Sequence, residues 1–223
     1  MSTTVTYRVA AVALIAGGVL GVLSSVFGPA SVSIRTAMDS PLFYPSAVAS
    51  LISAMLILGG LPAVYLIQRG ESGLLGLVGM MILLATGMLM AIALSFTYLV
   101  ILPWVAGLPV ATARLDHGPA AFGILWPALA MAMILGAAIF GTATIRAGVL
   151  SPWLGVALTV AAVLNLVLGF LDLPGMLASL GGAALDLVLG WYGLEVWTRA
   201  ALPATVMVGS GRKGATEKPI SAS

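Results

Sequence analysis

Charged side chains are scarce in this chain. Only 7% of its 223 residues are Asp, Glu, Lys or Arg, whereas 61% are hydrophobic. Soluble globular proteins carry about 25% charged residues, because their surfaces have to be hydrated. The shortage of charge excludes a soluble domain and predicts a chain that is surrounded mainly by lipid. A net charge of +2 with no basic cluster also speaks against nucleic acid as a partner.

Metal-binding side chains are also scarce, because cysteine is absent and His117 is the only histidine. The lack of cysteine excludes disulfides, thiolate metal ligands and cysteine nucleophiles. A zinc or copper site needs several nitrogen or sulfur ligands, which one histidine does not supply. The methionines cluster in two apolar stretches, where flexible packing is the expected role and a copper path is the alternative. They include Met80, Met81, Met88, Met90, Met131 and Met133. We therefore predict no metal and no cofactor.

The apolar stretches also lack the groups of an intramembrane enzyme. None contains a lysine for a Schiff base or a serine–histidine pair for a protease. Asp172 and Asp186 are 14 residues apart. On one continuous helix that separation is roughly 21 Å, which is too far for a pair of catalytic carboxylates. The sequence therefore predicts a protein that is not an enzyme.

Six long apolar stretches account for most of the chain. Each has 19 to 25 residues, and about 20 residues of helix cross the roughly 30 Å of hydrocarbon in a bilayer. The alternating pattern of membrane β-strands is missing. We predict an all-α, multi-pass bundle in the cell membrane, with about six spans. The predicted spans are Val9–Phe27, Ala47–Ile67, Leu74–Tyr98, Ala121–Thr144, Trp153–Leu171 and Leu177–Trp197.

The bundle is predicted to occupy residues 1–202, followed by a flexible cytoplasmic tail over residues 203–223 that is rich in Gly, Ser, Thr and charge. Arg8 precedes the first apolar stretch, as in a signal peptide. However, Val9–Phe27 is longer than the apolar region of a usual signal peptide, and five more spans follow. The sequence therefore favours a first helix that is retained.

The basic residues indicate the orientation of the six spans. Seven of the nine Lys and Arg residues fall on the side of the two termini, and Arg35 and Arg114 fall on the other. Because basic loops stay in the cytoplasm, both termini are predicted to be cytoplasmic. The seven are Arg8, Arg69, Arg146, Arg199, Arg212, Lys213 and Lys218.

Three local features refine this prediction. Pro62 and Pro127 fall inside spans and are expected to kink them, because proline lacks a backbone donor. The third stretch stays apolar as far as Leu102, so it either tilts or ends in a turn at the interface. Glu195 and Arg199 are four residues apart at the end of the last span, a spacing that predicts an ion pair.

Three polar residues lie deep inside predicted spans, namely Asp186, Asn165 and Thr86. Asp186 is eleven residues from Trp197, which places it roughly 17 Å from the cytoplasmic end of its helix. Asn165 and Thr86 have similar depths. An ionisable residue at mid-membrane costs about 2.5–3.5 kcal/mol on insertion scales, so these residues form the candidate intramembrane site.

The sequence leaves two interpretations of Asp186 open. In one it is a structural acid, either protonated or hydrogen-bonded to Asn165 and Thr86, that fixes the register of the helices. In the other it binds a proton or a cation at mid-membrane, as acidic residues do in carriers. The fifth and sixth spans form an antiparallel hairpin, so Asn165 is expected to face Asp186.

Glycines surround this acid in the sequence. Gly182, Asp186 and Gly190 recur every four residues and therefore share one stripe of their helix. Gly17 and Gly21 begin a similar stripe in the first span, which Ser25 continues. Because glycine allows helix backbones to approach closely, these stripes are predicted to be helix-packing seams.

Two turns resemble each other, Arg69–Gly76 and Arg146–Gly155, and a duplicated helical hairpin and chance remain alternative explanations. The segment Arg146–Val156 also resembles the arginine–small–glycine–apolar–leucine turn of uncharacterised bacterial multi-pass membrane families, called domains of unknown function. Ser151 stands one position before the proline of this segment, where that pattern would itself have proline. The resemblance extends loosely over the last hundred residues and implies a bundle like theirs, without implying any chemistry.

These observations favour a non-enzymatic accessory or scaffold subunit that packs with other membrane proteins or with itself. The alternative is a small proton-coupled carrier or a hydrophobic-ligand binder that uses Asp186 and Asn165. In both cases the bilayer is the surrounding partner.

Overall fold

The computed structural model describes residues 3–28, 38–106, 120–171, 173 and 175–200. Over these residues the chain is helical and contains no strand. Four helical segments are long and apolar enough to cross a membrane, namely Thr4–Phe27, Phe43–Trp104, Gly123–Ala147 and Pro152–Phe170. The helices are α1 (Thr3–Phe27), α3 (Phe43–Phe96), the π-helix η1 (Thr97–Ile101), α4 (Leu102–Ala106), α6 (Ala120–Ala147), α7 (Pro152–Phe170) and α8 (Gly175–Ala200).

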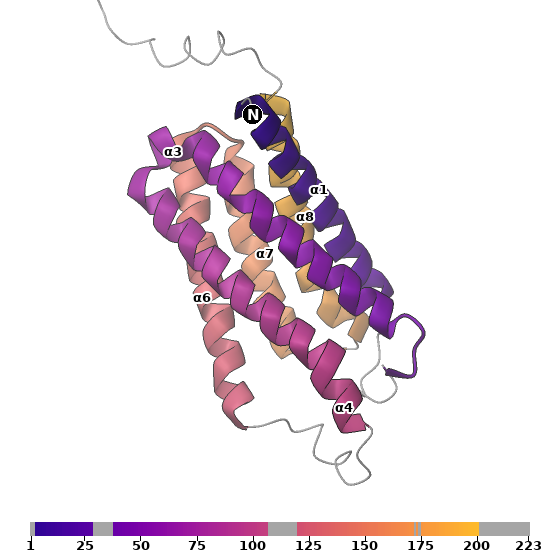
Figure 1. The fold of residues 1–223 in the computed structure, drawn as a ribbon. Coiled ribbons are helices and arrows are strands. Elements are labelled where there is room, and N and C mark those ends of the chain that lie inside the picture. Colours follow the sequence, from indigo (N-terminus) through magenta and orange to yellow (C-terminus); the bar gives the residue numbers. More distant parts are fainter. Residues whose placement is uncertain (1–2, 29–37, 107–119, 172, 174, 201–223) are drawn as a thin grey trace, which may run out of the picture.

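Helix α3 is a hairpin of two legs (Figure 1). Gly73 is the residue within it that leaves the helical region, with φ 54° and ψ −146°. Glycine adopts a positive φ without steric cost, so the chain can turn back at this point. The rings of Phe43, at the start of the helix, and Tyr98, just past its end, are 6.1 Å apart between centroids. The predicted second and third spans are therefore two antiparallel legs of one element, residues 43–72 and 74–96.

The second leg of α3 is continued by helix beyond Leu102, where the sequence allowed a turn at the interface. Thr97–Ile101 form a π-helix, and Leu102–Ala106 continue as α4. Pro103 lacks the N–H of an ordinary helical turn and its ring would meet the carbonyl four residues back, so the wider π turn accommodates it. At Pro62, by contrast, the backbone of the first leg stays helical.

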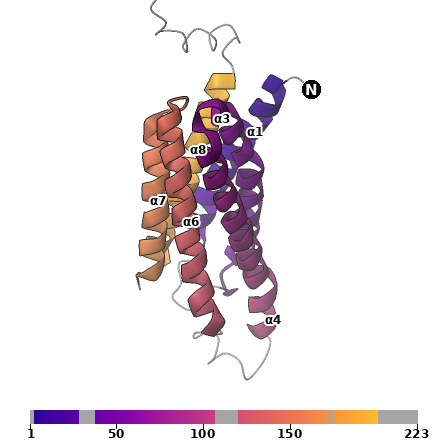
Figure 2. The ribbon, with the colours of Figure 1, turned by 90° about the vertical axis from the view of Figure 1, so that its left-hand side faces the viewer.

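The long helices form a ring in which α1 packs against α3, α3 against α6, α6 against α7 and α7 against α8 (Figures 1 and 2). The ring is closed by contact between α1 and α8. Between α3 and α6, Gly79 lies against the backbone of Phe140. Between α6 and α7, Gly141 and Gly155 face each other. Small residues at these crossings let the backbones approach closely, as expected for helices in lipid.

Most of the tightly buried apolar side chains lie toward one end of the ring. This end, here called the terminal half, contains the first residues of α1, the last residues of α8 and the turns at Gly73 and Gly148. The main buried cluster extends from there to the middle of the bundle and includes Leu14, Val64 and Tyr192, none of which is exposed. At the opposite end, the distal half, α6 and α4 stand apart (Figure 2).

The two turns of the proposed repeat share a backbone feature. Gly73 and Gly148, with φ 54° and 60°, are the glycines with positive φ among the described residues. Gln68 beside the first turn donates a hydrogen bond of 3.2 Å to Thr144 beside the second. Both turns thus lie together in the terminal half.

Several sequence predictions concern residues outside those that the structure describes. They include the tail over residues 203–223 and the residues Arg35, Arg114, His117 and Asp172.

Candidate intramembrane polar site

The middle of α8 faces α1 through the stripe Gly182, Asp186 and Gly190. A Cβ added to Gly182 would be 3.6 Å from the hydroxyl oxygen of Ser25. A Cβ added to Gly190 would be 3.5 Å from the Cα of Gly18. Because residues four apart share one face of a helix, Asp186 between these glycines also faces α1.

Gly21 of α1 makes room for the Asp186 carboxylate. A Cβ on Gly21 would contact the carboxylate oxygen Oδ2 and its carbon, and it would be 2.8 Å from the hydroxyl oxygen of Ser53. Three helices therefore meet here, because Ser53 belongs to the first leg of α3. We call Asp186, Ser53 and Gly21 the Asp186 site.

The hydrogen bond of Ser53 determines what the Asp186 site can bind. Ser53 is 3% exposed, and its hydroxyl donates a 2.7 Å hydrogen bond to the carbonyl of Gly17. With its one hydrogen committed, the Ser53 oxygen can only accept, and an ionised carboxylate can only accept as well. Within the described part of the chain, no hydrogen bond reaches the Asp186 carboxylate. The site therefore offers two acceptors and no donor.

Asn165 lies beside the α8 stripe, about one helical turn from Asp186 toward the distal half. A Cβ on Gly181 would be 3.2 Å from the Asn165 side-chain oxygen, and one on Gly182 would be 3.8 Å from it. The structure thus places Asn165 at the same seam as Ser25, next to the Asp186 site.

Thr86 has different partners from the other two predicted site residues. It is 6% exposed, and its hydroxyl donates to the carbonyls of Ile82 at 2.7 Å and Leu83 at 3.3 Å, within its own helix. Such bonds to the preceding turn are common for a hydroxyl inside a helix. Thr86 is not among the residues that contact the seam of Asp186, Ser53 and Asn165.

The basic side chains of α1 and α8 lie far from Asp186, at the terminal end. Arg8 stands over the ring of Trp197, with its guanidinium carbon 5.6 Å from the ring centroid. Arg199 and Glu195 form an ion pair with a nitrogen–oxygen distance of 3.5 Å, which confirms the pair predicted from their spacing.

A second buried polar cluster lies in the terminal half and was not predicted. Thr144 accepts hydrogen bonds from Gln68 at 3.2 Å and from Tyr192 at 3.5 Å, and it donates to the carbonyl of Phe140 at 3.0 Å. Gln68, Thr144 and Tyr192 are fully buried. These hydrogen bonds link α3, α6 and α8, which are distant in sequence. The cluster was not predicted because the sequence does not show which helices lie next to one another in the bundle.

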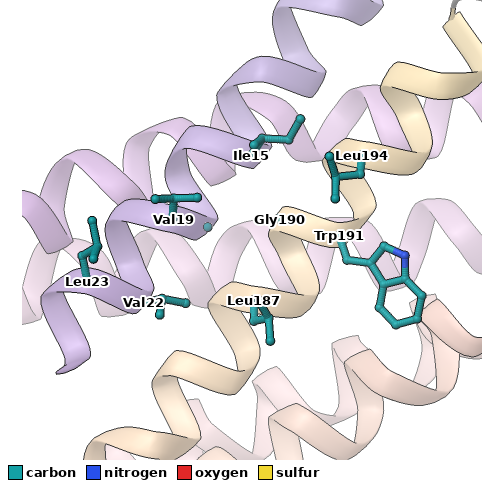
Figure 3. A pocket seen from close by; sticks show the side chains of 9 residues that line it. Ile15, Val19, Val22, Leu23, Leu187, Gly190, Trp191 and Leu194 are labelled. Atoms are coloured by element: carbon teal, nitrogen blue, oxygen red, sulfur yellow. The ribbon is translucent and has the colours of Figure 1, made fainter.

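An apolar groove follows the outer face of the α1–α8 seam (Figure 3). Its volume is about 470 Å³. Gly18 and Gly190 form its floor, because the two helices approach closely there, and longer side chains form its walls. These walls are Ile15, Val19, Val22, Leu23, Leu187, Trp191 and Leu194. Leu187 is 66% exposed and Val19 is 55% exposed, so the groove opens away from the bundle.

Comparison of the chain with family models, with curated proteins and with solved structures finds no match. The resemblance of the turn at Arg146–Val156 to multi-pass membrane families therefore stays a prediction.

Proposed function

We propose that the protein is a small multi-pass carrier of the cell membrane, and that the Asp186 site binds a proton or a small monovalent cation. The observation that carries this proposal is the pairing of two acceptors, the Asp186 carboxylate and the Ser53 hydroxyl oxygen, around Gly21. An ionised carboxylate in an apolar surrounding is costly unless it is paired. A proton or a cation on Asp186 removes that cost.

The hydrogen bonds speak against a structural acid that is held by Asn165 and Thr86. A structural Asp186 was expected to be either protonated or hydrogen-bonded to these two residues, and the contacts bear on the second form. Thr86 instead donates within its own helix, and among the described residues no donor reaches the carboxylate. An ionisable residue inside the membrane is by default a candidate functional site.

The topology that goes with this proposal has six spans and cytoplasmic termini. It counts the two legs of α3 separately and includes α8, whose 26 residues are long enough to cross. The turns at Gly73 and Gly148, the first residues of α1 and the last residues of α8 share the terminal half, where Arg69 and Arg146 also lie. The rule that basic loops remain inside assigns this half to the cytoplasm.

Flux in reconstituted vesicles tests the carrier function. Vesicles with the purified protein are expected to conduct protons or Na⁺ or K⁺ faster than empty vesicles, and Asp186→Asn is expected to abolish the difference. Glu195→Gln is the matched control, because this acid lies at the terminal end in an ion pair and its flux should equal that of the native chain. Equal flux for Asp186→Asn and the native chain would remove the proposal.

The groove favours a second candidate function, an accessory subunit that packs with another membrane protein or with a second copy. Two ridges of large apolar side chains flank a glycine floor, a shape that accepts an apolar helix at short distance. Val19→Trp and Leu187→Trp fill the groove, whose lining does not include Asp186, so each should reduce co-purification of a partner in mild detergent. Purification of the native chain as a lone monomer would count against this function.

A further inference from the structure

We infer that Asp186 takes up its proton or cation from the distal face of the bundle only, along a path that passes Ser25 and Asn165. This inference rests on the proposed carrier function and adds the side of access to it. It follows from the contrast between the two halves of the α1–α8 seam on either side of Asp186.

On the distal side of Asp186 the seam is lined by polar side chains. Ser25 lies four residues beyond Gly21 on α1, which is about 6 Å toward the distal end. Its hydroxyl oxygen is 3.6 Å from the Cβ position of Gly182, and the Asn165 oxygen is 3.8 Å from the same point. Ser25, Asn165 and Asp186 are all half-buried. Oxygen ligands from three helices thus lie along the seam between the distal end and the carboxylate.

On the terminal side of Asp186 the same seam is apolar and tightly packed. A Cβ on Gly18 would be 2.7 Å from the Cα of Gly190. One turn further, a Cβ on Gly193 would be 2.8 Å from the carbonyl oxygen of Ala11 and from the Cβ of Leu14. Ala11 and Leu14 are fully buried. Backbones that meet this closely leave no space for water.

This contrast fixes the direction of access. A cation or a hydrated proton that moved through the terminal half would lose its water without gaining oxygen ligands, at a large cost in free energy. Along the distal half, hydroxyl and amide oxygens replace part of that hydration. Release toward the terminal side then requires α1 and α8 to separate at Gly18 and Gly190, as alternating access demands.

Cysteine accessibility tests this inference, because the native chain contains no cysteine. Ser25→Cys and Asn165→Cys place single thiols on the distal path, and Ser25→Cys exchanges groups of similar size. Thr144→Cys is the matched control in the terminal half, at a buried polar position. Val19→Cys controls for lipid-exposed thiols in the groove. The probe is a membrane-impermeant, positively charged methanethiosulfonate, which is applied to right-side-out and to inverted vesicles. A further variant, Ser223→Cys, reports on which side the C-terminus lies.

The expected result is labelling of Ser25→Cys and Asn165→Cys from the face opposite Ser223→Cys, with no labelling of Thr144→Cys or Val19→Cys from either face. Labelling of either path position from the side of the termini would overturn the inference, as would a failure of both positions to react in vesicles that label at Ser223→Cys. Distal labelling together with unchanged flux in Asp186→Asn would leave the access path standing and reject the carrier function alone.

Discussion

At the scale of single residues, the Asp186 site depends on the missing side chain of Gly21 and on the committed hydroxyl hydrogen of Ser53. Gly21 has no side chain, so the carboxylate of Asp186 occupies the space beside α1. Ser53 gives its hydrogen to the carbonyl of Gly17, so it accepts and does not donate. In the proposed function, these two residues leave the carboxylate available to a proton or a cation.

The first prediction concerns Gly21. Gly21→Ala places a methyl group on the carboxylate of Asp186 and close to Ser53, and overpacking of this kind costs about 1–3 kcal/mol. The melting temperature in detergent should fall. Gly59→Ala is the matched control, because nothing lies within 4 Å of its Cβ position and alanine favours the helix by roughly 0.5–1 kcal/mol. A Gly21→Ala protein as stable as Gly59→Ala would contradict the contact.

Some residues of the Asp186 site could be predicted from the sequence and others could not. The depth of Asp186 and Asn165 follows from the sequence, because apolar stretches show where each helix crosses. The glycine stripe of α8 follows from its spacing, and the structure sets that stripe against α1. Ser53 was missed because its role depends on which helix lies beside α8 and α1, which no local pattern encodes. Thr86 was included on depth alone, whereas its hydroxyl bonds to its own helix.

At the scale of elements, the hairpin of α3 depends on one residue. The lengths of the apolar stretches predicted each helical rod, with ends displaced by a few residues. They did not predict that the helix would continue through residues 68–72 and reverse at a single glycine. Composition marks residues 69–73 as polar, but it does not show how abrupt the reversal is.

The second prediction concerns this turn. At Gly73, φ 54° and ψ −146° form a combination that residues with a Cβ avoid, at a cost of order 1–3 kcal/mol. Gly73→Ala should therefore lower the melting temperature. Gly70→Ala, three residues away with nothing near its Cβ position, is the matched control and should not lower it. Equal melting temperatures for the two variants would show that the turn does not need its glycine.

At the scale of the whole molecule, the two halves of the bundle differ in how their interiors are packed and in how polar the α1–α8 seam is. The terminal half holds the main buried cluster and the polar link of Gln68, Thr144 and Tyr192. The Asp186 site lies at the boundary, and the polar seam continues into the distal half.

The third prediction tests the polar link of the terminal half. Thr144→Val removes the acceptor of Gln68 and Tyr192 while it keeps the shape of the side chain, and a buried donor left without a partner costs about 1–3 kcal/mol. Thermal unfolding should show a clear loss of stability. Thr198→Val is the control, because the Thr198 hydroxyl donates to the carbonyl of Glu195 in an exposed position. A loss of stability no greater than in Thr198→Val would mean that the link does not hold the helices together.

The protonation of the Asp186 carboxyl group can be measured on the protein itself. Infrared difference spectroscopy on the protein in bilayers reports the carbonyl band of a protonated carboxylic acid, and Asp186→Asn identifies which band belongs to Asp186. If Asp186 binds a proton or a cation, this band is present at low pH and disappears when the pH is raised or when a monovalent cation binds. A band that stays unchanged through both titrations would show that Asp186 is a permanently protonated, structural acid and not a binding site.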